Sequence, residues 1–287
     1  MQGFRSRLAA RQKAVNSLVC VGLDPLMERT PQEWLCRGSI SDAAKLWMTR
    51  VVDATAPFAS MFKPQRAHWE AIFDGERALA AVISYIKTQY PEIPVFLDCK
   101  RGDIDRTQQQ YRHTHFELDG ADGMNYNPYM GRGTLENLID RDHLERALVG
   151  LGRTSNQDAW EIQDLMLQTG RRLWEDMVER ILDWSSDLGV LANAGVVMGA
   201  AHKDPNNPLA IYSQHLRRAK EIHKGALWTL IPGIGTQGGF IKETVEAAFV
   251  GPGWIAINSS SGIIFADDPA GAAEKLRDQI RAAGGSC

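Results

Sequence analysis

The sequence predicts a (β/α)8 barrel, and two observations support that prediction: the recurrence of short apolar runs and the helix-length stretches between them. Short apolar runs recur along the 287 residues, and each ends in a polar or glycine-rich segment. Helix-length stretches separate most of these runs, which indicates a parallel sheet because parallel neighbours need a crossover connection. A barrel of this kind has roughly 250 residues, so we expect residues 1–287 to form one domain. The rhythm alone leaves an open, doubly wound sheet as an alternative.

The individual elements follow from the periodicity of apolar residues. The predicted strands are residues 18–23, 60–62, 95–97, 121–124, 147–151, 195–198, 227–231 and 254–257. The predicted helices are residues 41–56, 70–88, 158–183, 208–223, 240–249 and 269–282. The first of these helices begins at a serine, a residue type well suited to capping.

Composition limits the classes of function. Hydrophobic residues make up 44% of the chain and charged residues 23%, which suits a folded domain with a large core. The formal net charge of -3 argues against a protein that binds nucleic acid. The 4 cysteines form no CxxC pair, so we interpret them as reduced thiols of a cytoplasmic protein. No apolar run is long enough to span a membrane, and the N-terminus lacks an apolar signal core.

The segment VFLDCKRGDIDRT, residues 95–107, places acids and a lysine directly after a predicted strand. Because side chains alternate along a strand, Asp98 and Lys100 share one face. The apolar residues between them suit the helix layer, so we expect Asp98 and Lys100 to point toward the mouth of the barrel. Asp103 follows Gly102, which permits a sharp turn, and stays within reach of the same space.

Asp24 and Lys63 also stand at the ends of predicted strands. The carboxyl ends of barrel strands meet on one face, so these charges should converge with Asp98 and Lys100. A surface ion-pair cluster is the simpler alternative, and such clusters contribute little to stability. The gathering of alternating charges favours a pocket in which acids and lysines keep one another ionised. Such a pocket would hold Lys100 protonated beside the carboxylate of Asp98.

A glycine-rich motif, GIGTQG at residues 233–238, follows a predicted strand and precedes a predicted helix. It fits the GxGxxG pattern of dinucleotide sites, but only 54 residues follow Gly233. The segment about twenty residues further on has no acid to bind a ribose. We therefore favour a phosphate cradle of backbone N–H groups over a dinucleotide site or a plain tight turn.

Three other segments give weaker signals. His113 and His115 are two residues apart and cannot face one metal from a helix, so we expect solvated histidines. The segment GRTSN, residues 152–156, offers hydroxyl and amide groups either to the polar edge of a ring or to a helix cap. The Trp and Leu positions of residues 165–184 repeat at helical spacing and are expected in the core.

Five motifs in order resemble the orotidine 5'-phosphate decarboxylases, specifically the longer bacterial subfamily often called type 2. They are FKPQ at 62–65, DxKRGDIxxT at 98–107, NPYMG at 127–131, RTSN at 153–156 and PGIGTQGG at 232–239. The resemblance runs from CVGLDP near the start to INSSSGIIFA near the end. It implies a homodimeric TIM barrel that decarboxylates orotidine 5'-monophosphate (OMP) to UMP in pyrimidine biosynthesis, without a metal or an organic cofactor.

The resemblance also implies roles for the residues of the charged segment. Lys100 would protonate C6 of the pyrimidine, and Asp98 would lie against the departing carboxylate. Asp103, together with Ile104 and Thr107, would reach the active site of the partner subunit.

Further roles concern the rest of the substrate. Asp24 and Lys63 would hold the ribose hydroxyls and complete the charge network. Ser155 would contact the pyrimidine edge, and Gln237 would reach the phosphate. The remaining substrate-binding residues implied by the resemblance are Pro232, Ser260 and Ser261.

The chain departs from the family pattern at the last strand. The family motif usually carries an arginine for the phosphate, as in SSRG, whereas this chain has serine at 259–261 followed by Gly262. An arginine–phosphate contact is bidentate and charge-assisted, and Ser261 cannot replace it. Asp105 and Arg106 also stand where the family commonly has small or amide residues.

These departures keep two alternatives open. One is a related barrel enzyme that acts on a sugar phosphate with a metal, although the RGDI spacing favours the nucleotide enzyme. The other is a nucleotide-binding protein without activity. The presence of Asp98, Lys100 and Asp103 argues against that second alternative, because an idle site has little need of a charge cluster.

Overall fold

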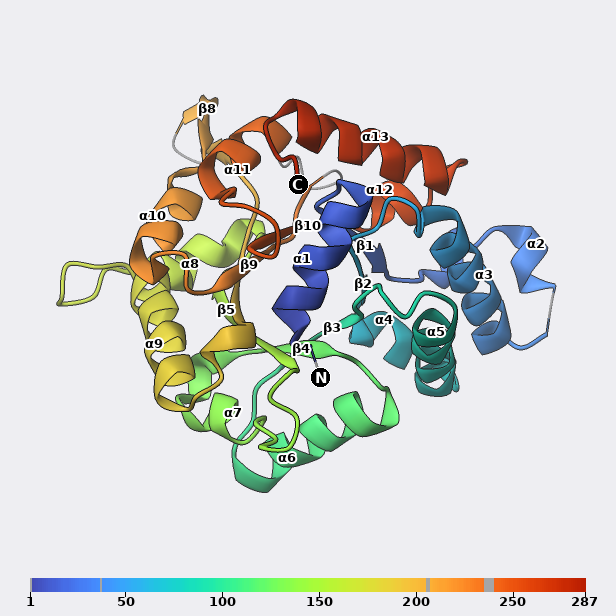
Figure 1. Cartoon of the computed structure of the whole chain (residues 1–287), viewed down its shortest axis with the longest axis horizontal. Helices are drawn as coiled ribbons and strands as arrows, with labels where there is room; N and C mark the ends of the chain where they lie inside the picture. Colours follow the sequence, from blue (N-terminus) through green and yellow to red (C-terminus); the bar gives the residue numbers. More distant parts are fainter. Residues whose placement is uncertain (1, 37, 205–206, 235–239) are drawn as a thin grey trace.

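Eight parallel strands form one sheet in the order β2-β1-β10-β9-β6-β5-β4-β3. The computed structural model describes residues 2–36, 38–204, 207–234 and 240–287. The two outer strands also meet, because bridges join Phe62 to Val95 and Gln65 to Asp98. The sheet therefore closes, and Figure 1 shows the helices arranged around it. This architecture is the predicted TIM barrel, and the open-sheet alternative is wrong.

Each barrel strand overlaps one of the apolar runs read from the sequence. The strands are β1 Val19–Leu23, β2 Met61–Pro64, β3 Phe96–Arg101, β4 Gly123–Tyr126, β5 Ala147–Arg153, β6 Ala194–Met198, β9 Trp228–Ile231 and β10 Ile255–Ser259.

The expected helix at 208–223 is wrong in its first half. There, β7 (His202–Asp204) and β8 (Asn207–Tyr212) form an antiparallel hairpin beyond the end of β6. Only the second half is helical, as α10 (Gln214–His223). The β-branched and aromatic residues Ile211 and Tyr212 favour the strand that the structure adopts.

The helices lie in the outer layer, with one exception at the base of the barrel. They are α1 Phe4–Val15, α2 Gln32–Leu35, α3 Ile40–Thr55, α4 Arg66–Glu70, α5 Gly75–Gln89, α6 Asp105–His113, α7 Gly133–Glu136, α8 Trp160–Gln163, α9 Leu173–Asp187, α11 Ile241–Ala248, α12 Ser261–Ile264 and α13 Pro269–Ala282. The predicted helices at 41–56, 240–249 and 269–282 are confirmed. The serine that caps α3 is Ser39, which accepts from the Asp42 N–H, and not the expected Ser41. Helices α1 and α6 were not expected from the sequence.

Two of the predicted helices are each divided. The helix expected at 70–88 is α5, separated from α4 by Asp74, whose φ of 57° cannot continue a helix. The helix expected at 158–183 is interrupted between α8 and α9, where Met166 pairs with Arg172 in a short antiparallel bridge. Leu165 in this segment is 54% exposed, so its expected place in the core is wrong.

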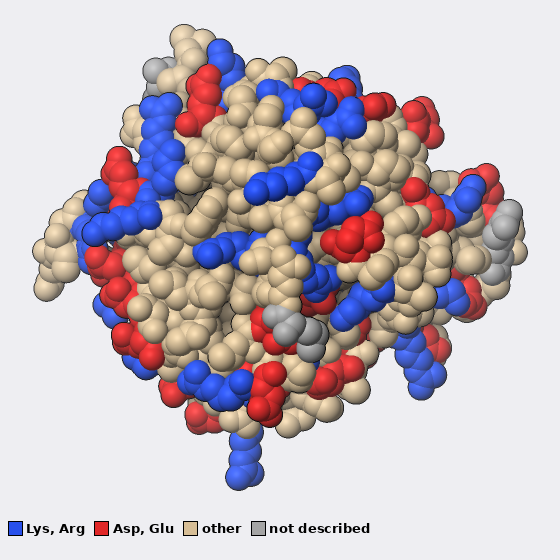
Figure 2. Space-filling view, viewed as in Figure 1, with Lys and Arg blue, Asp and Glu red and all other residues tan. Residues whose placement is uncertain are grey.

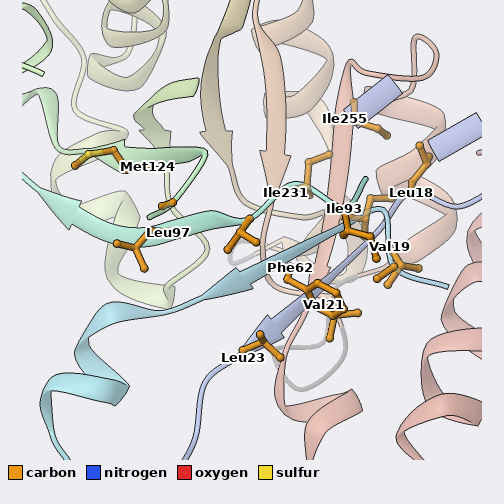
Figure 3. Packing of buried hydrophobic residues seen from close by; sticks show 14 of the residues in the cluster. Leu18, Val19, Val21, Leu23, Phe62, Ile93, Leu97, Met124, Ile231 and Ile255 are labelled. Carbon is orange, nitrogen blue, oxygen red and sulfur yellow. The ribbon is translucent and has the colours of Figure 1, made fainter. Parts of the chain in front are cut away.

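Two apolar layers follow from the alternation of side chains along the strands. Val19, Val21 and Leu23 of β1 face the helices, as Figure 3 shows, and pack in the larger buried cluster. The alternate residue Cys20 faces the lumen with Met61, Phe96 and other residues of a second cluster. All four cysteines are free.

Helix α1 closes the amino-terminal end of the barrel. Its Phe4 ring stacks on Trp228 inside the lumen, with ring centroids 5.4 Å apart. Gln12 donates to the Ile255 carbonyl at 2.8 Å and accepts from the Gly253 N–H at 2.6 Å, which ties the helix to the start of β10. Figure 1 shows α1 crossing the centre of the barrel. The lumen can therefore open only at the carboxyl ends of the strands.

The surface has mixed charge on the face that carries α1. Figure 2 shows lysine and arginine side chains interspersed with aspartate and glutamate there, without a broad basic area. None of the helices in the described ranges is both long and apolar enough to cross a membrane.

Candidate active site

A pocket of about 280 Å³ lies at the carboxyl ends of the barrel strands. It collects side chains from segments that are far apart in the sequence. Eight of the predicted site residues line it, namely Asp24, Lys63, Asp98, Lys100, Ser155, Pro232, Ser260 and Ser261. Asp103, Ile104 and Thr107 are not among its lining residues, and Gln237 lies outside the described residues.

Asp98 is the centre of the charge network. Its Oδ2 accepts from Lys63 Nζ at 2.9 Å, and its Oδ1 accepts from Lys100 Nζ at 2.6 Å. Asp98 is 7% exposed and Lys63 only 2%, whereas the Lys100 side chain reaches into the open part of the pocket. Alternation along β3 places Asp98 on the lumen side, above Phe96, as the sequence predicts.

The opposite charges of this network stabilise the ionised forms of Asp98 and Lys63. Burial by itself raises the pKa of Asp98, but the ammonium groups of Lys63 and Lys100 outweigh it. Together with hydrogen bonds from Lys100 and Asn125, they hold the pKa of Asp98 well below its ordinary value. Burial likewise lowers the pKa of Lys63, but the carboxylates of Asp98 and Asp24 outweigh it and raise that pKa above its ordinary value. Both groups are therefore charged at neutral pH.

The turn after β3 differs in detail from the expectation. Left-handed backbone conformations occur at Lys100 (φ 47°) and Asp105 (φ 46°), not at Gly102. Gly102 instead permits a close approach, because a Cβ there would lie 2.9 Å from the Asn127 carbonyl oxygen. The chain therefore bends at the residue whose ammonium group enters the pocket.

Asp24 joins the ends of two neighbouring strands. Its Oδ1 accepts from the backbone N–H of Gln65 at 3.0 Å, just beyond β2. Its charge also acts on Lys63, where it favours the ammonium form. Asp24 is thus fixed at the pocket wall, next to the charge network.

Asp103, Ile104 and Thr107 lie at the start of α6, outside the pocket. Asp103 is half-buried, and its Oδ1 accepts from the Ile104 N–H at 2.8 Å. Ile104 is 54% exposed, and Thr107 is exposed as well. Within this subunit these side chains reach no lining residue of the pocket by any described hydrogen bond.

The pocket wall formed by β10 is polar but carries no cation. Ser260 lies over β1, where a Cβ on Gly22 would be 1.8 Å from its Oγ, so only glycine fits there. Asn258 Nδ2 donates to the Ser260 Oγ at 3.4 Å. Among the described lining residues, the permanent charges are two carboxylates, Asp24 and Asp98, and two ammonium groups, those of Lys63 and Lys100.

Several lining residues were not named individually as site residues, although Thr154, Gly233, Ile234 and Asn258 lie within sequence motifs described above. They are His68, Asn125, Thr154, Val197, Leu230, Gly233, Ile234 and Asn258. His68 Nδ1 lies within hydrogen-bonding distance, 3.1 Å, of the Pro25 carbonyl oxygen. Asn125 lies two residues before the first residue of NPYMG. Because side chains alternate along a strand, the two positions share one face, which indicates that Asn125 points toward the same space as that motif. Asn258 lies within the INSSSG motif itself.

His115 does not match its expected solvated state. The chain continues from α6 into a π-helical turn, Thr114–Leu118, whose inner face is buried. His115 is fully buried there, with Nδ1 2.9 Å from Asp119 Oδ2, and burial lowers its pKa. His113 is exposed as expected. In the described part of the chain, no group of three or more His, Cys, Asp and Glu residues is placed to hold a metal ion.

Comparison with known proteins settles the family. The model of the orotidine 5'-phosphate decarboxylase / HUMPS family matches residues 17–276. The chain belongs to this family. The orotidine 5'-phosphate decarboxylase of Ralstonia nicotianae is 37% identical over 286 residues, covering 96% of this chain and 97% of the relative. That of Haloarcula marismortui is 37% identical over 272 residues, covering 93% and 88%.

Solved structures of this family have the same fold. The OMP decarboxylase of Leishmania donovani superposes with a TM-score of 0.79 at 31% identity, covering 98% of both chains. The Leishmania donovani UMP synthase gives 0.81 at 33% identity, covering 99% of this chain and 57% of that longer chain. The family and the barrel thus agree with the resemblance read from the sequence motifs.

Replacing Asp98 with asparagine tests the charge network. Asp98→Asn leaves Lys63 buried without its main counter-charge, so we expect the free energy of unfolding at pH 7 to fall by about 3–5 kcal/mol. Because folding lowers the pKa of Asp98, its stabilisation is present above the unfolded-state pKa of about 3.9 and is lost as the pH falls toward the folded-state value. The difference from wild type should therefore stay constant between pH 7 and pH 5 and shrink below about pH 4.

Urea unfolding of both proteins across this pH range provides the measurement. Asp187→Asn is a matched control, because Asp187 pairs with Arg132 on the surface. A loss at pH 7 no larger than that of the control would contradict the proposed coupling between Asp98 and Lys63.

Proposed function

We propose that this enzyme, a carboxy-lyase, decarboxylates OMP to UMP in de novo pyrimidine biosynthesis. The observation that carries the proposal is the buried Asp98 carboxylate, held between the ammonium groups of Lys63 and Lys100 at 2.9 and 2.6 Å. Membership of the family supports the choice of substrate.

In the proposed reaction, the bond between C6 of the pyrimidine and its carboxylate breaks, and CO₂ leaves. The electron pair of that bond stays on C6 and takes a proton from Lys100 Nζ. A positioned ammonium stabilises the negative charge as it develops, without reorganisation of the site. Asp98 orients Lys100 and, lying against the substrate carboxylate, repels it in the ground state. This chemistry needs no metal and no organic cofactor.

The rest of the pocket would hold the remaining parts of the nucleotide. Asp24 and Lys63 would bind the ribose hydroxyls, and Ser155 the edge of the pyrimidine. The phosphate would lie near Gln237, with further contacts from Pro232, Ser260 and Ser261. Contacts to this distant phosphate position the ring, so a substrate without phosphate should lose rate as well as affinity.

We propose a homodimer in which each pocket is completed by its partner. Asp103, Ile104 and Thr107 would enter the active site of the other subunit. Their position outside this subunit's own pocket and the exposure of Ile104 support this arrangement. Burial of the exposed Ile104 side chain against a second copy would remove apolar surface from water.

Two further features belong to the proposal. Residues 1–287 would act as a single barrel domain, and the protein would work in the cytoplasm. The metal-dependent sugar-phosphate enzyme is the alternative that shares this scaffold. It would need carboxylate ligands at the mouth, whereas Asp98 and Asp24 already interact with Lys63.

Loss of OMP absorbance in the ultraviolet measures the proposed activity directly. We expect the wild type to convert OMP equally well with and without EDTA. Lys100→Ala should reduce kcat by about 10²–10⁴-fold or more, because it removes the proton donor. Lys242→Ala is the control, since this lysine is exposed on α11. No conversion by the wild type would refute the decarboxylase proposal, and inactivation by EDTA would favour the metal-dependent alternative.

Restoring an arginine tests the phosphate position. Ser261→Arg should tighten UMP binding by about 10- to 150-fold, because charge-assisted hydrogen bonds contribute about 1.5–3 kcal/mol each. Ser286→Arg adds the same charge near the C-terminus and serves as the control. Calorimetric titration with UMP gives both affinities. Unchanged or weaker binding by Ser261→Arg would show that the phosphate is bound elsewhere.

Mixing two inactive variants tests the shared active site. In the proposed dimer, each pocket takes Lys100 from one subunit and Asp103 from the other. A dimer of one Lys100→Ala subunit and one Asp103→Ala subunit therefore has one pocket with both changes and one pocket with neither. Random exchange should restore roughly a quarter of wild-type activity, because half of the dimers are mixed and each has one good site. If the mixture after subunit exchange stays as inactive as its components, Asp103 acts within its own subunit.

A further inference from the structure

A β-bulge lies beside the charge network. β3 and β4 pair at Leu97–Met124 and again at Arg101–Tyr126. Three residues of β3, numbers 98–100, therefore stand opposite Asn125 alone. The additional residues interrupt the backbone ladder and leave N–H groups of β3 without strand partners. Two of the three residues in this bulge are Asp98 and Lys100.

The side chain of Asn125 takes the place of the missing ladder. Its Oδ1 accepts from the backbone N–H of Cys99 at 2.9 Å and from that of Lys100 at 2.7 Å. Its Nδ2 donates to Asp98 Oδ1 at 2.7 Å. Asn125 is 1% exposed, so these contacts are made away from water. One amide group thus binds the backbone of the bulge and its carboxylate together.

The chemistry of this position suits only an amide. The oxygen end meets two backbone donors, and the nitrogen end meets a carboxylate that has no proton to give. An aspartate would present a second negative oxygen to Asp98, and an apolar residue would leave the two N–H groups buried without partners. Lys100 also needs such support, since its φ of 47° is a conformation that residues other than glycine rarely adopt.

We propose that Asn125 is a positioning residue for the decarboxylation reaction. It holds the backbone of Lys100 in its left-handed conformation and turns the Asp98 carboxylate toward both lysines. Lys100 Nζ and Asn125 Nδ2 share the same oxygen, Oδ1 of Asp98, so a shift of the amide moves the proton donor as well. The inference rests on the proposed function for its catalytic consequence, but the geometry that it describes is independent of the substrate.

Asn125→Asp gives the decisive experiment. The new carboxylate can still accept from the two N–H groups, but its second oxygen faces Asp98 at hydrogen-bonding distance. Two adjacent carboxylates take up one shared proton more readily than either alone. When that proton is bound, the introduced carboxyl group would donate to Asp98 as the amide did. We therefore expect kcat to fall about 100-fold at pH 8 and to recover at least tenfold at pH 5, with KM changed less than threefold.

Two variants separate positioning from general damage. Asn125→Ala removes donor and acceptor together, so its kcat should be low at every pH. Asn193 is a matched buried asparagine at the other end of the barrel, where it accepts from the Arg5 N–H and donates to the Leu144 carbonyl. Asn193→Asp should lower the melting temperature but keep the pH profile of the wild type.

The outcomes distinguish the inference from the proposed function. A wild type that does not convert OMP would refute the proposed function alone, because the melting temperature still tests the shared proton. The melting temperature of Asn125→Asp should approach that of the wild type as the pH falls from 8 to 5. The inference is wrong if Asn125→Asp keeps the pH profile and the melting behaviour of the wild type. It is also wrong if Asn193→Asp shows the same recovery of kcat between pH 8 and pH 5.

Discussion

A buried carboxylate between two ammonium groups is the interaction on which the site depends. Removing Asp98 or Lys63 from water is costly, and their attraction offsets that cost only where the geometry is good and the remaining hydrogen-bonding positions are filled. The barrel meets both conditions. β2 and β3 bring Lys63 and Asp98 to the lumen side, and Asn125 fills a further position on the carboxylate. The closed sheet therefore serves as a rigid frame for a charge arrangement that would be unstable on a flexible loop.

The parts of the molecule that follow from local pattern were predictable. The eight strands follow from apolar runs, and the inward direction of Asp98 follows from alternation with Leu97, which packs against the helices. Gathering of Asp24, Lys63, Asp98 and Lys100 at one pocket follows from the rule that strand ends of a barrel share one face. No knowledge of contacts between strands was needed for these inferences.

Features that depend on pairing between distant segments were not predictable in this way. The bulge in β3 is defined by its register with β4, and that register cannot be read from either strand alone. The role of Asn125 follows from the bulge and was missed for the same reason. His115 and the β7–β8 hairpin show a second limit, because tertiary packing decides the burial of one and the strand conformation of the other.

The balance of charge around the pocket has a consequence for the encounter with substrate. Two carboxylates and two ammonium groups line the described wall, so their fields cancel a short distance outside the mouth. A multiply charged anion would feel little long-range attraction on its approach. The association rate of such an anion should then depend only weakly on ionic strength. Enzymes whose active-site entrance is lined mainly by cationic side chains show a stronger dependence. Recognition would begin at contact, through hydroxyl and amide groups, after diffusion has delivered the molecule to the opening.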